Sequence, residues 1–306
     1  MKSSIAEPRT PTGSLPPDQG STGLARSTAF REASTFVGLV ALMVVGLALA
    51  LPHAGIVVLL TMPTPLLALL LITFLRTPRG RRKELWASLG AHRLGLRSWP
   101  VAFVASVVLI FVIPYGVADL LGSAAIKSLG TTPDAWLTAS LGVFASLVGI
   151  TLMAMTEELG WRGFLLPRVQ VLMPKRRAAL AVGFIHGLFH MPLTLMTTTY
   201  NSVGNRWIVA ASVMVLITSA GVFYAWLKDR SGSVWPVAFA HSTVNTFLGG
   251  AGFVVILSPT ALAYTAGESG LVTMAAVVAT AVALLIWGRG WDNDSSTRMV
   301  ATDQVS

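Results

Sequence analysis

The sequence predicts an all-α, polytopic membrane protein with eight transmembrane helices, and three observations support this fold class. Of its 306 residues, 54% are hydrophobic and only 11% are charged, whereas a soluble domain carries about 25% charged residues. The apolar residues fall in long stretches, and roughly 20 apolar residues make a helix that crosses a bilayer core of about 30 Å. The basic residues gather in the short segments between those stretches.

Eight apolar stretches are long enough to cross a bilayer as helices. The expected spans are Phe36–Ala54, Ile56–Leu75, Val101–Leu121, Ala135–Thr156, Ala178–Thr198, Trp207–Leu227, Val234–Leu257 and Val272–Trp287. Only a short turn at Pro52–Gly55 separates the first two. Four prolines lie within or near spans, and we expect each of them to kink its helix: Pro63, Pro65, Pro114 and Pro236.

The chain divides into three parts. Residues 1–34 are polar and rich in Pro, Ser, Thr and Gly, which predicts a disordered cytosolic tail and no signal peptide. Residues 35–290 form the transmembrane domain, whose functional core we expect at about 135–250. Residues 291–306 form a cytosolic C-terminal tail.

The positions of the basic residues test the number of spans, because cytosolic loops are rich in Lys and Arg. With the N-terminus in the cytosol, 20 of the 22 Lys and Arg fall in cytosolic segments, and only Lys127 and Arg206 fall outside. The net charge of +9 therefore reflects topology rather than nucleic-acid binding. We expect a multi-pass protein of the cell (plasma) membrane with both termini cytosolic, and the Ala, Val, Leu and Arg usage indicates a bacterial source.

Ionisable residues inside spans are costly and therefore mark candidate sites. The first group is Glu157, Glu158 and Arg162, at the cytosolic end of the fourth span. Glu158 and Arg162 are four residues apart on one helix face and can pair, whereas Glu157 points about 100° away. A carboxylate without a partner suits a general base acting on water. The alternative is that both acids are interfacial groups at a helix end.

The second group is His186 and His190, which share one face in the middle of the fifth span. Two imidazoles on one face can bind a metal, but no Glu lies between them as in the H-E-x-x-H motif. Intramembrane histidines also form hydrogen bonds between helices, so this pair alone is weak evidence of a site. Since the chain has no cysteine, thiol chemistry is excluded.

The third group is His241 and Asn245, again four residues apart, in the cytosolic half of the seventh span. Together they offer donors to a developing oxyanion. The alternative is a polar packing seam that includes the neighbouring Ser and Thr residues. At 1.5 Å per residue, His190 lies roughly 18 Å and His241 about 10 Å into their spans. The three groups thus lie at similar depths, whereas Asp119 ends the third span and is assigned no role.

These three groups resemble the motifs of the CPBP family of intramembrane peptidases, which includes the Rce1-type CAAX prenyl endopeptidases and the Abi (bacteriocin-immunity-like) proteins. The family pattern is E-E-x-x-x-R, then F-x-x-x-H, then H-x-x-x-N or -D, on three helices of an eight-helix bundle. Glu157, Glu158 and Arg162 match the first motif, and His241 and Asn245 match the third. In the second, His190 matches, but His186 holds the place of the usual aromatic.

The resemblance implies a CAAX-protease-like bundle in which Glu157 and His190 activate a water for attack on a peptide carbonyl. His241 and Asn245 would stabilise the oxyanion, and Glu158 with Arg162 would hold the shape of the site. Glu157, His190 and His241 are also candidate ligands of a catalytic Zn²⁺. No cofactor is firmly required, because Asn and Arg fit an oxyanion-and-clamp design better than a zinc shell.

Three functions remain open on the sequence. The first is an intramembrane endopeptidase acting on a peptide or membrane-protein substrate. The second is a non-catalytic membrane scaffold or immunity protein that binds such a partner. The third is a transporter, which ranks last because no internal repeat is visible. The sequence does not identify the natural substrate, and nothing in it indicates prenylated proteins.

Overall fold

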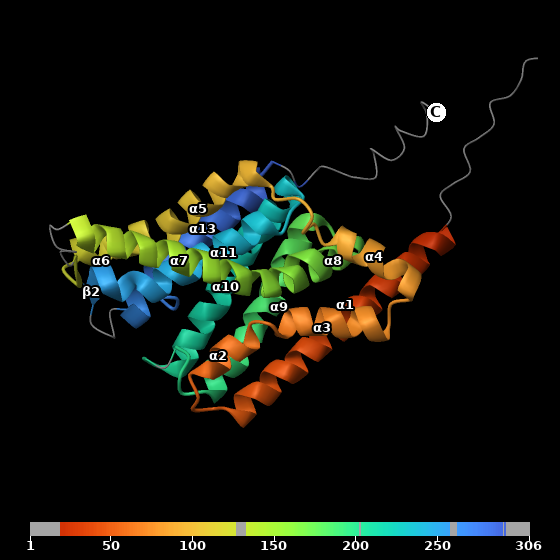
Figure 1. The fold of residues 1–306 in the computed structure, drawn as a ribbon, viewed down its shortest axis with the longest axis horizontal. Coiled ribbons are helices and arrows are strands. Elements are labelled where there is room, and N and C mark those ends of the chain that lie inside the picture. The colour runs from red at the N-terminus through yellow and green to blue at the C-terminus, as the bar shows by residue number, and fades with distance from the viewer. Residues whose placement is uncertain (1–18, 127–132, 202, 258–261, 290, 292–306) are drawn as a thin grey trace, which may run out of the picture.

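The computed structural model describes residues 19–126, 133–201, 203–257, 262–289 and 291, and of residues 19–24, 251–257, 262 and 263 it describes the backbone alone. Helices dominate the described chain (Figure 1), and the all-α class is confirmed. In chain order the longer helices are α1 (Gln19–Ala50), α2 (Ile56–Thr61), α3 (Thr64–Leu75), α4 (Arg79–Ser88), α5 (Trp99–Val107), α6 (Ile113–Leu120), α7 (Pro133–Glu158), α8 (Leu166–Leu172), α9 (Lys175–Met196), α10 (Arg206–Ser231), α11 (Trp235–Val254) and α13 (Leu271–Trp287).

Short elements join or extend these helices. One 3-10 turn precedes α5, and π-type turns link α5 to α6, link α7 to α8 and precede α13; they are η1 (Leu96–Ser98), η2 (Val108–Val112), η3 (Leu159–Leu165) and η4 (Leu262–Ala266). Two three-residue strands, β1 (Ala124–Ile126) and β2 (Val255–Leu257), pair antiparallel with Ala125 opposite Ile256. In Figure 1, α6 and β2 lie at the opposite end of the molecule from α1 and α4.

Seven helical segments of the described chain are long and apolar enough to cross a membrane. They are Ala25–Ala50, Ile56–Leu75, Leu96–Leu120, Pro133–Leu172, Lys175–Met196, Arg206–Ser231 and Tyr264–Trp287. The remaining predicted span, Val234–Leu257, corresponds to α11, part of which is described by its backbone alone. The polytopic membrane class is therefore confirmed, while the count of eight stays a prediction.

The fourth span is longer than predicted. Instead of ending near Thr156, the helix continues through η3 into α8 as one segment of 40 residues, Pro133–Leu172. At 1.5 Å per residue this is about 60 Å, twice a bilayer core. The sequence predicts Glu157, Glu158 and Arg162 at the end of this span. The helix continues past them because these charged side chains are paired inside the protein. The π-type turn falls just before Pro167, whose missing N–H interrupts regular helix bonding.

The N-terminal helix also starts earlier than predicted. Residues 19–34, predicted to belong to a disordered tail, form the beginning of α1. Ala29 and Ala33 are buried, and Glu32 pairs with Arg168 of α8 at 2.6 Å. These tertiary contacts stabilise a segment whose polar composition predicts disorder. Residues 1–18, Lys127 and residues 292–306 lie outside the described part of the chain.

The helices that carry the candidate residues pack tightly against one another. α9 contacts α10 along much of its length, and α7 contacts α11. α9 and α10 approach closely at two glycines: a Cβ on Gly221 would lie 2.5 Å from the Cα of Gly183. Small residues at such crossings allow the close helix packing that is common in membranes. By contrast, α7 exposes a row of large apolar side chains, including Trp136, Phe144 and Leu152, as expected for a surface that faces lipid.

We predict that Gly221→Ala destabilises the protein by about 1–3 kcal/mol, because the added methyl group meets backbone rather than a movable side chain. The measurement is thermal unfolding in detergent micelles, followed by tryptophan fluorescence. Gly149→Ala on α7 is the matched control, since its Cβ meets no atom within 4 Å. An equal effect of the two substitutions would contradict the close packing of α9 on α10.

Candidate active site

The structure brings the residues of all three sequence motifs together. Glu157 and Glu158 are the last residues of α7 and are buried, with exposures of 2% and 0%. Arg162 follows in η3 and is completely buried. The imidazole of His186 on α9 contacts both η3 and α7, and that of His241 on α11 contacts Glu158.

Glu158 and Arg162 form the ion pair that their spacing predicted. Arg162 Nη1 lies 3.0 Å from both carboxylate oxygens of Glu158, and both side chains are 0% exposed. Glu158 Oε1 also accepts a hydrogen bond from His241 Nδ1 at 2.9 Å. The guanidinium lies 4.9 Å from the ring centre of Tyr224, which in turn stacks on His241. Glu158 is thus fully engaged by cationic and donor groups.

Glu157 has a different environment. Its Oε2 lies 3.2 Å from His186 Nε2, and no Lys or Arg of the described chain forms an ion pair with it. Two adjacent glutamates at a helix end therefore reach different partners, as the 100° rotation between neighbouring helix residues allows. Only one of them is held by an arginine.

The protonation of His186 follows from its two partners. Arg162 Nη1 lies 3.2 Å from His186 Nδ1. A guanidinium can only donate hydrogen bonds, so Nδ1 must accept and the ring proton lies on Nε2. The Nε2–H then donates to the Glu157 carboxylate. His186, which the sequence left without a role, therefore links Arg162 to Glu157.

One group of side chains has the composition of a metal site. Ligand atoms of Glu157, His186 and His190 all lie within 4.8 Å of one another. The predicted set contained His241 in place of His186, whereas the group that the structure brings together contains His186. The group does not fit a divalent cation while Arg162 donates to His186, since a neutral imidazole has one lone pair and Nδ1 already uses it.

His190 is held from the other side by residues that the motifs do not include. Its Nδ1 lies 2.9 Å from the hydroxyl of Tyr200, and that hydroxyl lies 2.6 Å from Glu268 Oε1. Glu268 Oε2 accepts a further hydrogen bond from Asn201 Nδ2 at 3.0 Å. Tyr200 and Asn201 follow α9, whereas Glu268 precedes α13.

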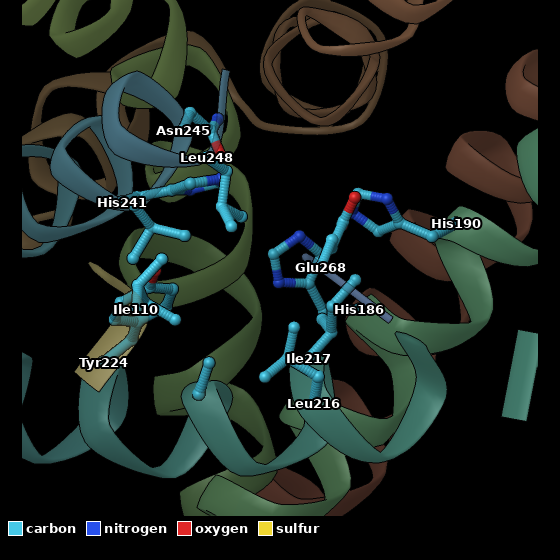
Figure 2. A pocket seen from close by; sticks show the side chains of 12 residues that line it. Ile110, His186, His190, Leu216, Ile217, Tyr224, His241, Asn245, Leu248 and Glu268 are labelled. Atoms are coloured by element: carbon cyan, nitrogen blue, oxygen red, sulfur yellow. The ribbon is translucent and has the colours of Figure 1, made fainter. Parts of the chain in front are cut away.

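A cavity lies between the two histidine-bearing helices. Figure 2 shows His241 and Asn245 on one side of it, and His186, Glu268 and His190 on the other. Apolar side chains complete the lining, among them Ile110, Leu216, Ile217, Val244 and Leu248. The arrangement combines convergent polar groups with apolar walls, as in many sites that bind an organic substrate.

Sequence reasoning missed three side chains at this site. Tyr224, Tyr200 and Glu268 belong to no motif, and Glu268 precedes the last predicted span rather than lying within it. The one available signal was that Glu268 is an acid in an otherwise apolar stretch. Asp119, which received no role, is exposed on α6 and takes no part in the cavity.

Comparison with known families agrees with the motifs. The family described as type II CAAX prenyl endopeptidase Rce1-like matches residues 138–247. The match begins within α7, ends within α11 and contains all three motifs. The protein thus carries an Rce1-like domain, and the resemblance predicted from the motifs is confirmed. Tyr200 also falls within the matched segment, whereas Glu268 and helices α1–α6 and α13 lie outside it. No curated protein matches the chain.

We predict that Arg162→Met lowers the free energy of unfolding by about 3–5 kcal/mol, because it leaves the buried Glu158 without its cation. Chemical unfolding in detergent micelles measures the loss. Glu32→Gln is the control: it breaks the ion pair with Arg168, but the Glu32 side chain is 40% exposed, so a cost of at most about 1 kcal/mol is expected. Equal costs for the two pairs would contradict the importance assigned to the buried one.

Proposed function

We propose that the protein is an intramembrane endopeptidase in which Glu157 and His190 activate a water molecule for attack on a peptide carbonyl. The observation that carries this proposal is the proximity of the Glu157, His186 and His190 ligand atoms, all within 4.8 Å of one another. Two hydrogen bonds of about 2.8 Å through one water span about 4.6 Å. A single water can therefore contact both Glu157 and His190.

Glu157 suits the role of general base in this proposal. It is buried, receives a hydrogen bond from His186 and forms no ion pair with an arginine of the described segments, so it is free to accept a proton. As the water oxygen attacks the carbonyl carbon, one water proton passes to Glu157. The same proton then passes to the nitrogen of the leaving amine as the peptide C–N bond breaks, and the carboxylate is regenerated.

His241 and Asn245 suit stabilisation of the oxyanion that forms during attack. Both lie on α11, four residues apart, and both border the cavity. Because Nδ1 of His241 contacts Glu158, its Nε2 is the nitrogen left to meet the substrate. In its protonated form the imidazole of His241 donates from Nε2 to the oxyanion, and the amide of Asn245 supplies a second donor. Glu158 and Arg162 hold this side of the site in shape.

The substrate class we propose is a peptide or a membrane protein that enters from the bilayer. The apolar walls of the cavity, such as Leu216 and Leu248, favour an apolar segment beside the cleaved bond. We also propose that the protein lies in a bacterial cell membrane with both termini in the cytosol, as the distribution of Lys and Arg predicts.

We predict that Glu157→Gln lowers proteolysis by about 100-fold or more, since the variant keeps the shape of the side chain but removes the base. The measurement is proteomics of native membranes that contain either protein, searching for new peptide termini that appear only with the wild type. Glu84→Gln, at an exposed position on α4, is the control and leaves those termini unchanged. Identical termini with wild type and Glu157→Gln would end the peptidase proposal and favour a non-catalytic scaffold.

We predict that metal chelators leave this cleavage intact, because Arg162 occupies the lone pair that His186 would offer to a metal. Membranes are treated with EDTA or 1,10-phenanthroline before the Glu157-dependent peptides are counted. As a readout independent of activity, Zn²⁺ is expected not to raise the unfolding temperature, since a bound ligand would stabilise the folded state. Loss of cleavage that added Zn²⁺ restores would instead support a metallopeptidase.

A further inference from the structure

Tyr200 connects His190 to a carboxylate that lies outside the segment matched by the family. The hydroxyl oxygen of Tyr200 lies within hydrogen-bond distance of both His190 Nδ1, at 2.9 Å, and Glu268 Oε1, at 2.6 Å. Glu268 follows the match, which ends at residue 247. The three side chains form an unbroken chain of hydrogen bonds from the loop before α13 to the cavity (Figure 2 shows His190 and Glu268).

With Glu268 ionised, the direction of these hydrogen bonds is set by which groups can donate. The carboxylate of Glu268 accepts from the Asn201 amide at its second oxygen and from Tyr200 at its first. A phenol has a single hydrogen, which Tyr200 gives to Glu268, so its oxygen must accept from His190. Burial, reinforced by the nearby Glu268 charge, raises the pKa of the Tyr200 phenol well above its ordinary value, and Tyr200 therefore keeps its proton.

We propose that Tyr200 and Glu268 are positioning residues that hold His190 as the Nδ1–H tautomer, so that its Nε2 lone pair faces the site. The inference rests on the proposed function for its consequence: an Nε2 lone pair can accept a hydrogen bond from the attacking water and orient it, while Glu157 takes the other water proton. The hydrogen bond made by one ring nitrogen decides which form the other nitrogen takes. The opposite tautomer would present an N–H to the water instead.

The two histidines of α9 are then held in opposite tautomers. His186 accepts at Nδ1 from Arg162 and donates from Nε2 to Glu157. His190 donates from Nδ1 to Tyr200 and accepts at Nε2. The centres of the two rings are only 5.4 Å apart. They nevertheless act on different groups, because His186 orients the Glu157 carboxylate and His190 orients the water.

The backbone around this chain of hydrogen bonds is itself fixed. Tyr264 accepts at its hydroxyl from the backbone N–H of Asn205 at 2.6 Å, which ties the segment before α13 to the start of α10. Arg206 donates to the carbonyl oxygens of Leu195 and Thr197 at the end of α9. The segments that carry Tyr200 and Glu268 are therefore joined by contacts that do not depend on His190.

The direct test is the tautomer of His190, measured by NMR of protein labelled with ¹⁵N and ¹³C histidine in lipid nanodiscs. The chain has five histidines, and His190→Gln assigns the signal. In the wild type at neutral pH we expect the proton on Nδ1. In Tyr200→Phe the acceptor is lost, and we expect the Nε2–H form to become populated. Tyr115→Phe, which removes a buried hydroxyl without a partner among the described residues, leaves the His190 signal unchanged.

A second readout uses a peptide that native membranes cleave in a Glu157-dependent manner. Tyr200→Phe is expected to lower kcat by about 10- to 100-fold with KM unchanged, because part of the general-base contribution is lost. Glu268→Gln keeps an acceptor oxygen for Tyr200 and retains more activity than Glu268→Ala. A purely structural role would instead lower activity in proportion to the loss of folded protein.

Two results would overturn the proposal: a wild-type His190 protonated on Nε2, or a tautomer that Tyr200→Phe does not change. The wild-type tautomer is measured on the wild-type protein, and His190→Gln serves only to assign its signal. If the tautomer behaves as expected but no Glu157-dependent cleavage exists, the positioning of His190 stands and the peptidase function fails. The two proposals are thus tested separately.

Discussion

The buried ion pair between Glu158 and Arg162 is the interaction on which the other contacts of the site depend. Both side chains are fully removed from solvent. A buried charge is tolerated only where its partners compensate for its lost hydration. Here the compensation joins three parts of the fold, since Arg162 contacts His186 of α9 and Glu158 contacts His241 of α11. The same pairing lets the fourth span continue as a helix through η3 into α8 instead of ending at its charged residues. One pair of charges therefore sets both the local backbone and the convergence of the helices.

This pair also explains how two adjacent glutamates can differ in chemistry. Glu158 is held by Arg162 and His241, whereas Glu157, rotated about 100° around the helix, receives a hydrogen bond from a neutral imidazole. A carboxylate engaged by a guanidinium is a poor base, and one without such a partner is available to accept a proton. The neighbouring charges thus give Glu158 a structural role and leave Glu157 available for chemistry, although both residues are glutamates.

Hydrogen-bond direction, more than residue identity, distinguishes the two histidines of α9. Arg162 can only donate and Glu268 accepts, so the chains of hydrogen bonds that start from these two residues impose opposite tautomers on His186 and His190. The aromatic residue usual at the position of His186 could not link Arg162 to Glu157. The imidazole of His186 does so, and it also stacks on Trp161, with the two ring centres 5.1 Å apart. The position thus keeps the packing role of an aromatic and adds a hydrogen-bond donor.

The sequence by itself determined the membrane class, most span positions, the pairing of Glu158 with Arg162 and the three helices that form the site. These features depend on local properties: apolar length, and the spacing of residues that share a helix face. Only the tertiary structure decided that His186 joins the site, that α1 begins at Gln19 and that Tyr200 and Glu268 reach His190. Those contacts join residues that are 10 to 136 positions apart in sequence. They arise from how helices pack and loops return over them, which no spacing along a single helix encodes.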